Sequence, residues 1–486
     1  MIKRVTILLA LLSFYCSTNA QLRNSKWCFG DSVGIDFINP QNPQVFSTAG
    51  FCRGSSASIA DSLGNLQLYS HTKYYHPWTQ QCDKYTVVYN FADTVIGNGD
   101  CITGSGWYQE LIFLPVFNKS KFFLFCADAT SDKNGLVYSL INGNINNGGG
   151  GVTKKDKRVN NYKQVDCVNA VKHGNGRDWW VFSRRFDKTL NGFNFWDIYL
   201  VNDTGVVDSV IQQVGTASKQ SLARTAISKD GKRIAFVNAW NLVEVYDFDR
   251  CTGIISNPIT IVGQLSNNID VWLGVAFSPN GKVLYLSNWG TKSLVQYDLT
   301  AANIAASKFV VYTDTTPGVQ YGGLALAPDD KIYHTWWGCT HLGVINNPDS
   351  LSKQCNYAPN SFYLGGKHSN MSLPNNPNYE LGPDTGSVCD SLGLGFASSA
   401  SNSKSIMHVA PNPIYKNLLR IQCTLQSNYI SQLEIIEVCG VVIFQEEYSP
   451  SNEWQAIQLP QLKNGIYLCK ISNGAESICS KFVVIK

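Results

Sequence analysis

The chain has 486 residues, of which 44% are hydrophobic and 15% are charged, and its formal net charge is +4. This composition can bury a large core and excludes an intrinsically disordered protein, while the length favours two or more domains. The charge is small and forms no basic stripe, so the sequence offers no electrostatic reason to expect a nucleic-acid partner.

The N-terminal segment has the three parts of an export signal. A short basic start is followed by an apolar run over residues 5–15, and small residues end the segment at Ala20. This order predicts a Sec signal peptide over residues 1–20, so that the mature chain begins at Gln21. A lipoprotein signal at Cys16 is the alternative, but bulky residues precede this cysteine. No transmembrane span is predicted in the mature chain, because no later segment of about 20 residues is sufficiently apolar.

The body of the chain, residues 21–395, has the pattern of β structure almost throughout. Short runs rich in Val, Ile, Tyr, Phe and Trp are separated by Gly, Asn, Asp and Pro. Three segments share one pattern, with equivalent lysines at Lys232, Lys282 and Lys331, spaced 50 and 49 residues apart. In each segment a strand ends in a short turn, Asp-Gly or Asn-Gly in the first two, and a second strand follows. Such repeats are typical of propeller blades, so we expect an all-β fold with a β-propeller of about seven blades, six or eight remaining open.

A change in composition separates the body from the tail. Ser398 to Ser405 are small and polar, and a flexible linker is predicted over residues 396–409. Residues 410–486 contain several short strands joined by Gly and Asn turns, which predicts a small Ig-like β-sandwich.

Cysteine usage agrees with an exported protein. The chain has 15 cysteines and no Cys-x-x-Cys pair, so zinc ribbons and thioredoxin-like redox sites lack their signature, and disulfides are expected. Cys469 and Cys479 flank a predicted hairpin turn and would face each other across a three-residue loop, which makes them a candidate disulfide. A second candidate pair is Cys339 and Cys355.

Five motifs of the tail carry a resemblance to a known family. They are Pro411 to Pro413, 433–440, 459–467, 470–471 and 481–484. In this order they resemble the type A C-terminal sorting domain of the type IX secretion system, which belongs to the Bacteroidetes. The resemblance implies that the type IX machinery is a partner and that the protein is secreted or reaches the outer cell surface. The motif residues that it singles out are Pro411, Asn412, Pro413, Gly440, Gly465, Tyr467 and Lys481.

The body carries a second resemblance, on residues 27–37, 60–66, 135–139 and 246–253. These segments are similar to the WD-repeat or YVTN-like propeller regions of Bacteroidetes surface proteins. The similarity implies a propeller and no particular activity.

Tryptophans are the strongest candidates for a ligand site. Trp240, Trp289, Trp336 and Trp337 follow or end the second strand of successive repeats. Loops between second and third strands share one face of a propeller, so these side chains could form an aromatic arc that binds a glycan or a peptide. The alternative is that they pack between blades.

No motif for catalysis, a cofactor or a metal is found. The chain lacks Gly-x-Ser-x-Gly and His-Glu-x-x-His, and His334, Cys339 and His341 do not complete a metal site. The sequence therefore favours a binding or interaction module for a glycan, peptide or protein over an enzyme. The alternatives are a lactonase-like or glycan-cleaving propeller hydrolase, and a structural or adhesive surface component.

Overall fold

The computed structural model describes residues 22–73, 85–104, 108–117, 119–128, 135–186, 193–218, 221–263, 271–387, 389–390, 406–410, 412–414, 417–424, 431–437, 442–473 and 477–484. The predicted signal peptide and most of the predicted linker lie outside these residues. The chain divides into two compact units, Met1–Pro383 and Asp384–Lys486. The helices described are two short 3-10 turns, η1 (Ala305–Ser307) and η2 (Ser352–Cys355), and no described helix is long and apolar enough to cross a bilayer.

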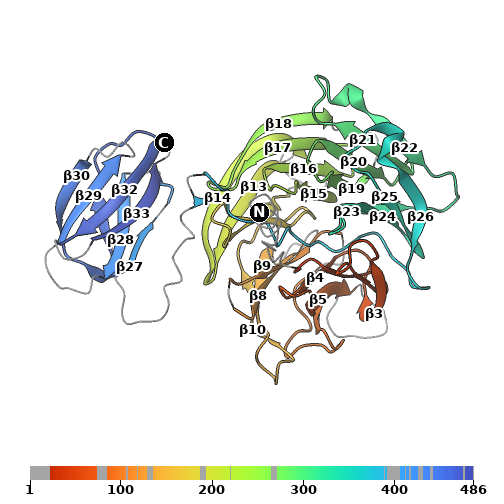
Figure 1. Cartoon of the computed structure of the whole chain (residues 1–486), viewed down its shortest axis with the longest axis horizontal. Helices are drawn as coiled ribbons and strands as arrows, with labels where there is room; N and C mark the ends of the chain where they lie inside the picture. Colours follow the sequence, from red (N-terminus) through yellow and green to blue (C-terminus); the bar gives the residue numbers. More distant parts are fainter. Residues whose placement is uncertain are drawn as a thin grey trace, which may run out of the picture. The chain divides into compact units, whose positions relative to one another are not determined.

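The first unit contains seven antiparallel sheets, each built from strands that are consecutive in the chain. Figure 1 shows them around a ring, with β4, β15, β19 and β23 toward its middle. The expected all-β propeller of seven blades is therefore confirmed. In chain order the blades are β1 (Lys26–Phe29), β2 (Asp31–Asp36) and β3 (Gln44–Phe51); β4 (Ser56–Ala60), β5 (Leu66–Lys73) and β6 (Tyr85–Asn90); β7 (Leu111–Pro115), β8 (Lys121–Ala127), β9 (Leu136–Asn142) and β10 (Gly151–Arg158); β11 (Asn169–Lys172), β12 (Trp179–Arg184), β13 (Phe193–Asn202) and β14 (Gly205–Ser218); β15 (Ala223–Ile227), β16 (Arg233–Asn238), β17 (Val243–Asp249) and β18 (Ile254–Val262); β19 (Trp272–Phe277), β20 (Val283–Asn288), β21 (Ser293–Asp298) and β22 (Phe309–Thr313); and β23 (Tyr321–Leu326), β24 (Ile332–Trp336), β25 (His341–Ile345) and β26 (Tyr357–Tyr363).

The repeated hairpin between first and second strands has a side-chain cause. In the fifth blade the Asp230 carboxylate accepts the backbone N–H two residues on at 3.0 Å, and Gly231 adopts a φ of 74°. Asn280 and Gly281 do the same in the sixth blade, at 2.8 Å and 70°. Asp330 takes the glycine position in the seventh blade with a φ of 60°, which Asp tolerates better than most residues.

The blades are apolar on both faces because each packs against its neighbours. Every residue of β20 is buried, as expected for a strand covered on both sides. The first and last blades meet through Trp27, Phe37 and Tyr333, whose ring centroids lie 5.0 to 5.8 Å apart. Among the described strands, no sheet combines the two ends of the body. The ring is therefore closed by side-chain packing and by the segment that follows the last blade.

That segment, residues 369–381, passes through the middle of the ring, and we call it the channel segment. Its Met371 N–H donates to the carbonyl of Arg53 at 3.0 Å, before the second blade. The N–H of Gly323, on the innermost strand of the seventh blade, donates to the Met371 carbonyl at 2.9 Å. A side chain at Gly322 would strike this carbonyl, since an added Cβ would lie 2.5 Å from it.

Asn375 is the polar centre of the channel segment. Its amide nitrogen donates to the carbonyls of Leu111 and Val168, both at 2.8 Å. Its side-chain oxygen accepts the Gln109 amide at 3.1 Å, and its backbone N–H donates to Ser56 at 2.8 Å. One residue thus connects the second, third and fourth blades.

The far end of the channel segment is equally well fixed. Tyr379 is fully buried, with its ring edge-on to Trp179 at 6.1 Å between centroids. The Arg250 guanidinium then donates to the carbonyl of Gly382 at 2.5 Å, just beyond the channel.

The second unit is a small β-sandwich, as expected. Its two sheets have the orders β27-β28-β31 and β30-β29-β32-β33 and enclose one apolar core. The strands are β27 (Ile406–Ala410), β28 (Leu418–Thr424), β29 (Ser431–Glu437), β30 (Val442–Tyr448), β31 (Ser451–Gln458), β32 (Gly465–Ser472) and β33 (Ser477–Val484).

The hairpin register separates the two cysteines proposed as a disulfide in the tail. Ser472 pairs with Ser477, so four residues rather than three connect the strands, and Cys469 pairs with Ser480 instead of Cys479. The two thiols therefore lie on opposite faces of the sheet, Cys469 buried and Cys479 exposed, and neither forms a disulfide. A loop one residue longer is sufficient to reverse the prediction.

The body also departs from the expected cysteine pairing. Cys339 and Cys355 are both buried free thiols in different core clusters. Disulfides do occur, and they involve Cys101, Cys251 and Cys389.

We predict that Asn375→Ala destabilises the body, because it leaves the carbonyls of Leu111 and Val168 without their amide donor. Two buried acceptors without partners should lower the free energy of unfolding by about 2–4 kcal/mol. The matched control is Asn378→Ala, which removes two exposed hydrogen bonds, one given to the Lys229 carbonyl and one accepted from the Glu380 N–H. Thermal and denaturant unfolding of the full chain measure both, and equal losses for the two variants would contradict a special role for Asn375.

Candidate ligand-binding pocket

A hydrogen bond repeated in three blades places the tryptophans. The residue that follows the second strand donates its N–H to the residue before the first strand. In the sixth blade Trp289 donates to Val271 at 2.8 Å, and in the seventh Trp337 donates to Gln320 at 3.0 Å. The fifth blade has Ala239 at this position, and Trp240 is the next residue in the turn. Because the blades repeat around the ring, the three turns converge on the same mouth of the channel.

The turns and the channel segment together form a pocket of about 530 Å³. This volume is in the usual range for small-ligand sites. Met371 of the channel segment belongs to the pocket, and with Tyr108 and Leu273 it forms a small apolar cluster. The lining residues are Arg53, Tyr108, Leu222, Ala239, Trp240, Val271, Leu273, Trp289, Gln320, Trp337 and Met371.

The structure separates the four candidate tryptophans into two groups. Trp240, Trp289 and Trp337 line the pocket, and Trp289 and Trp337 are 39% and 48% exposed. Trp336 instead packs against Tyr321 and His334, at 6.3 and 5.8 Å between ring centroids. The packing interpretation therefore fits Trp336, whereas the other three side chains are available to a ligand.

Arg53 and Tyr108 stand on the loops that lead into the second and third blades. The Arg53 guanidinium lies 5.8 Å from the centre of the Trp337 ring and 6.0 Å from that of Tyr108. Tyr108 is 5% exposed, and burial raises the pKa of its phenol. It therefore stays protonated at physiological pH.

A buried carboxylate beneath the pocket fixes Tyr108. Asp166 accepts the backbone N–H groups of Tyr108 and Gln109 at 2.8 and 2.6 Å. Burial raises the pKa of Asp166 to about 6, against the opposing effect of these bonds and of Arg224. Arg224 lies with its guanidinium 5.5 Å from the centre of the Tyr108 ring, and burial lowers its pKa to about 10. It therefore remains a cation at neutral pH.

Sequence reasoning missed Arg53, Tyr108 and Met371. Arg53 and Tyr108 precede the first strands of blades that lack the clear repeat, and Met371 follows the last blade. The positions before first strands in the clear repeats, such as Leu222 and Gln320, would have been a usable signal, since the same positions line the pocket.

A second cavity of about 210 Å³ lies along the channel segment toward the other end of the ring. Polar groups line much of it, and several pair with one another. Gln109 donates to the Thr225 carbonyl at 2.9 Å, and the Asn376 amide donates to Asn24 at 3.0 Å. This pairing holds the channel segment to the blades.

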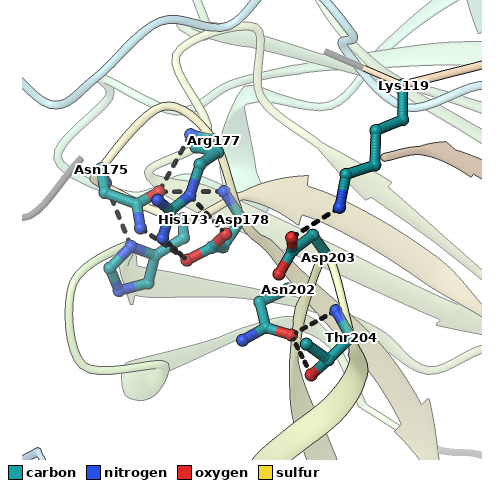
Figure 2. Close-up of polar contacts among 8 residues, drawn as sticks. All are labelled: Lys119, His173, Asn175, Arg177, Asp178, Asn202, Asp203 and Thr204. Carbon is teal, nitrogen blue, oxygen red and sulfur yellow. Dashed lines mark hydrogen bonds and ion pairs between the residues drawn. The ribbon is translucent and has the colours of Figure 1, made fainter. Parts of the chain in front are cut away.

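Figure 2 shows a polar cluster on hairpin loops of the third and fourth blades. The Asp178 carboxylate accepts the amide of Asn175 at 2.8 Å and the Arg177 guanidinium at 2.9 Å, and His173 accepts the Asn175 N–H at 3.0 Å. These side chains satisfy one another, which fits a cluster that shapes the loop. The residues drawn are Lys119, His173, Asn175, Arg177, Asp178, Asn202, Asp203 and Thr204.

The three residues considered for a metal site have separate partners. His334 Nδ1 lies 3.0 Å from the Tyr357 hydroxyl, and burial lowers its pKa to about 3, so it stays neutral. Cys339 contacts the hydroxyl of Thr335, whereas the ring of His341 lies against Tyr363. Among the described residues, no three His, Cys, Asp or Glu side chains gather as metal ligands would.

The motif residues of the tail hold the sandwich together. The side chain of Asn412 accepts the N–H of Val483 at 2.8 Å and donates to the carbonyl of Lys481 at 3.3 Å. Pro413 follows it before the bridge from Ile414 to the last strand. Asn412 thus attaches the start of the tail to β33.

Two further motif residues lie on the hairpin of β32 and β33. Tyr467 is buried, stacks on Phe482 at 5.7 Å between centroids and donates to the Lys463 carbonyl at 3.0 Å. Gly465 pairs with Val484 at the end of this hairpin. Pro411 and Gly440 lie outside the described residues.

Comparisons with known proteins agree with this division of the chain. Residues 408–486 match the family described as the secretion system C-terminal sorting domain. No curated protein matches the chain significantly. Similar solved structures include a periplasmic gluconolactonase of Pseudomonas aeruginosa, with 10% identity, coverage of 72% of this chain and 98% of that one, and a TM-score of 0.43.

Two further solved structures each cover 80% of this chain and 99% of their own, with a TM-score of 0.37. They are a protein from Lactobacillus plantarum, 12% identical, and a putative 6-phosphogluconolactonase from Bacteroides uniformis, 13% identical. The fold of the body rests on its own seven sheets, and the tail is assigned by the family match. The chain is therefore a β-propeller protein that carries a C-terminal domain of the secretion-system sorting family.

Proposed function

We propose that this protein is an exported binding module whose propeller holds a glycan, peptide or protein ligand at the tryptophan-lined pocket. The observation that carries the proposal is the convergence of Trp240, Trp289 and Trp337 from three blades on one pocket. Large rigid aromatic side chains give much contact area at a small cost in conformational entropy.

The exposure of these side chains favours binding over packing. A blade needs apolar residues between its sheets, and those positions are almost fully buried here, as Trp179 and Trp180 show at 3% and 2% exposure. Trp289 and Trp337 instead stay exposed beside a pocket. Exposed aromatic groups that gather around a concavity are typical of interaction sites.

The export route follows from the tail. The sorting domain supports recognition by the type IX secretion machinery, after which the protein is secreted or attached to the outer cell surface. We infer the corresponding plan of the chain: a signal peptide over residues 1–20, a propeller over 21–395, a linker from 396 and the sorting domain up to 486. The sequence suggested a boundary at 409/410, but β27 already pairs with β28 from Ile406, so we place the start of the sorting domain there. In this plan the ligand site and the export signal lie in separate domains.

We predict that removal of residues 410–486 leaves the protein in the periplasm. A finer test is Asn412→Ala, which removes the link to Val483 and Lys481 and should also reduce surface delivery. The control is Asn452→Ala, at an exposed residue of β31 whose hydrogen bond from the Gln422 amide ends on the backbone carbonyl, which the substitution keeps. Cell fractionation and surface proteolysis measure delivery, and unchanged arrival of the truncated protein at the surface would refute the sorting role.

We predict that Trp289→Ala and Trp337→Ala each weaken ligand binding at least tenfold, since each removes an exposed contact surface. Both should leave the melting temperature nearly unchanged. The matched control is Trp336→Ala, which should lower stability by about 3 kcal/mol because that side chain packs against Tyr321 and His334. Glycan and peptide arrays identify ligands, and calorimetry compares the variants. A large fall in the melting temperature of the first two variants would contradict the proposal, because it would show that these side chains pack in the core.

A further inference from the structure

We propose that the free edge of β14 is an interaction surface on which a second copy of this chain pairs, strand against strand, about Ile211. β14 is the outermost strand of the fourth blade, and Figure 1 shows it at the outside of the ring. It has 14 residues and ends its sheet, so no described strand pairs with its other edge. An open strand edge is a ready template for a further strand.

Other outermost strands of the body carry features that prevent such pairing. A proline interrupts two of them, Pro258 in β18 and Pro359 in β26. Proline has no N–H to donate to a neighbouring strand, so it blocks an edge. In β10 the last five residues include three lysines and one arginine, whose charges favour water over a second strand.

The outermost strands of the first, second and sixth blades are protected in other ways. In β3 the N–H of Phe51 donates to the His71 ring at 3.3 Å. The loop after β6 covers that strand, since Thr86 and Ile102 exchange backbone hydrogen bonds of 2.8 and 3.1 Å. β22 has only five residues. By contrast, β14 is long, contains no proline, lysine or arginine, and has Asp208 as its one charged residue.

The backbone of β14 offers a regular edge over residues 208–213. Its pairing with β13 is uninterrupted from Asp208 to Gln213, and irregularities lie on either side of this stretch. Alternate residues of an antiparallel strand direct their N–H and C=O groups away from the neighbour. Among the described side chains, the one that bonds to this stretch of backbone is Asp208, which accepts the Ser209 N–H at 2.7 Å.

The next blade holds this edge in place. The Gln212 amide donates to the carbonyl of Ile255 at 3.2 Å, and the Ile255 N–H donates to the Gln212 side-chain oxygen at 2.8 Å. These two bonds attach the regular stretch of β14 to β18 of the fifth blade. Because the strand is already ordered, pairing with another strand costs little conformational entropy.

The exposed side chains of the edge fit a second copy. Ser209, Ile211 and Gln213 are exposed, and Ile211 is 55% exposed. Antiparallel pairing about Ile211 sets Ile211 of one copy against Ile211 of the other, and Ser209 against Gln213 on both sides. Apolar and polar groups thus each meet their own kind, as cross-strand pairs require.

The charge pattern also favours a second copy. In this register Asp208 lies opposite Val214 of the other copy, so no two carboxylates face each other. The same surface is used by both copies, which gives a closed two-fold dimer. A contact built on so short a strand pair is smaller than a standard interface, so the dimer should dissociate on dilution.

Sedimentation velocity of the full chain over a range of protein concentrations tests this. The variants are Ile211→Lys and Ile211→Glu, and the matched control is Ile259→Lys. Ile259 is 46% exposed and follows Pro258 in β18, so this variant makes the same change on an edge that a proline already blocks. Thermal unfolding of each variant shows whether the fold is kept, which we expect because both isoleucines are exposed.

We expect the wild type to change from monomer to dimer as its concentration rises. Ile211→Lys and Ile211→Glu should each dimerise at least tenfold more weakly, because like charges would face each other across the two-fold axis. An equimolar mixture of the two should dimerise again, since lysine then faces glutamate. Ile259→Lys should behave as wild type. Ile211→Thr keeps a β-branched side chain without charge and should weaken the dimer even if the charged variants lose stability.

A wild type that stays monomeric at every concentration would overturn the proposal, whether the edge stays open or another segment of the chain covers it. A dimer that survives Ile211→Lys, or that is lost equally in Ile259→Lys, would overturn it by placing the interface elsewhere. A mixture of the two charged variants that stays monomeric would overturn the pairing of Ile211 with itself.

Discussion

The channel segment is the constraint on which the rest of the body depends. The described sheets are all local in sequence, so no strand exchange joins the last blade to the first. Closure comes instead from a segment that satisfies inner-strand backbone groups of several blades at once, with Asn375 connecting three of them. Because the segment follows the seventh blade, these bonds join the end of the body to blades near its start. The channel segment thereby links blades that each form from local hairpins.

The same segment determines the candidate site. Met371 lines the pocket and packs with Tyr108 and Leu273, and bonds from the channel segment to the carbonyls of Cys52 and Arg53 support the loop that carries Arg53. Asp166 and Arg224 act from below, one holding the backbone at Tyr108 and the other contacting its ring. The pocket is thus assembled from residues far apart in the chain and kept rigid by the element that closes the propeller.

The sorting domain uses a comparable device on a smaller scale. The Asn412 side chain bonds to the backbone N–H of Val483 and the backbone carbonyl of Lys481, as the backbone of a paired strand would. Tyr467 stacks on Phe482 inside the core. Residues that the sequence analysis singled out as motif residues thus take part in holding the sandwich together.

The sequence by itself determined the repeated hairpins, since Asp-Gly and Asn-Gly set the turn locally, and it indicated the tryptophan turns through their common position in each repeat. It could not determine what depends on the number of residues in a loop or on distant contacts. One extra residue in the hairpin loop separated Cys469 from Cys479. Two consecutive tryptophans were divided between packing and pocket, because Trp336 ends β24 whereas Trp337 begins the turn that follows. Arg53 and Met371 came together only in the folded ring, because the bonds that place them join residues more than 300 positions apart.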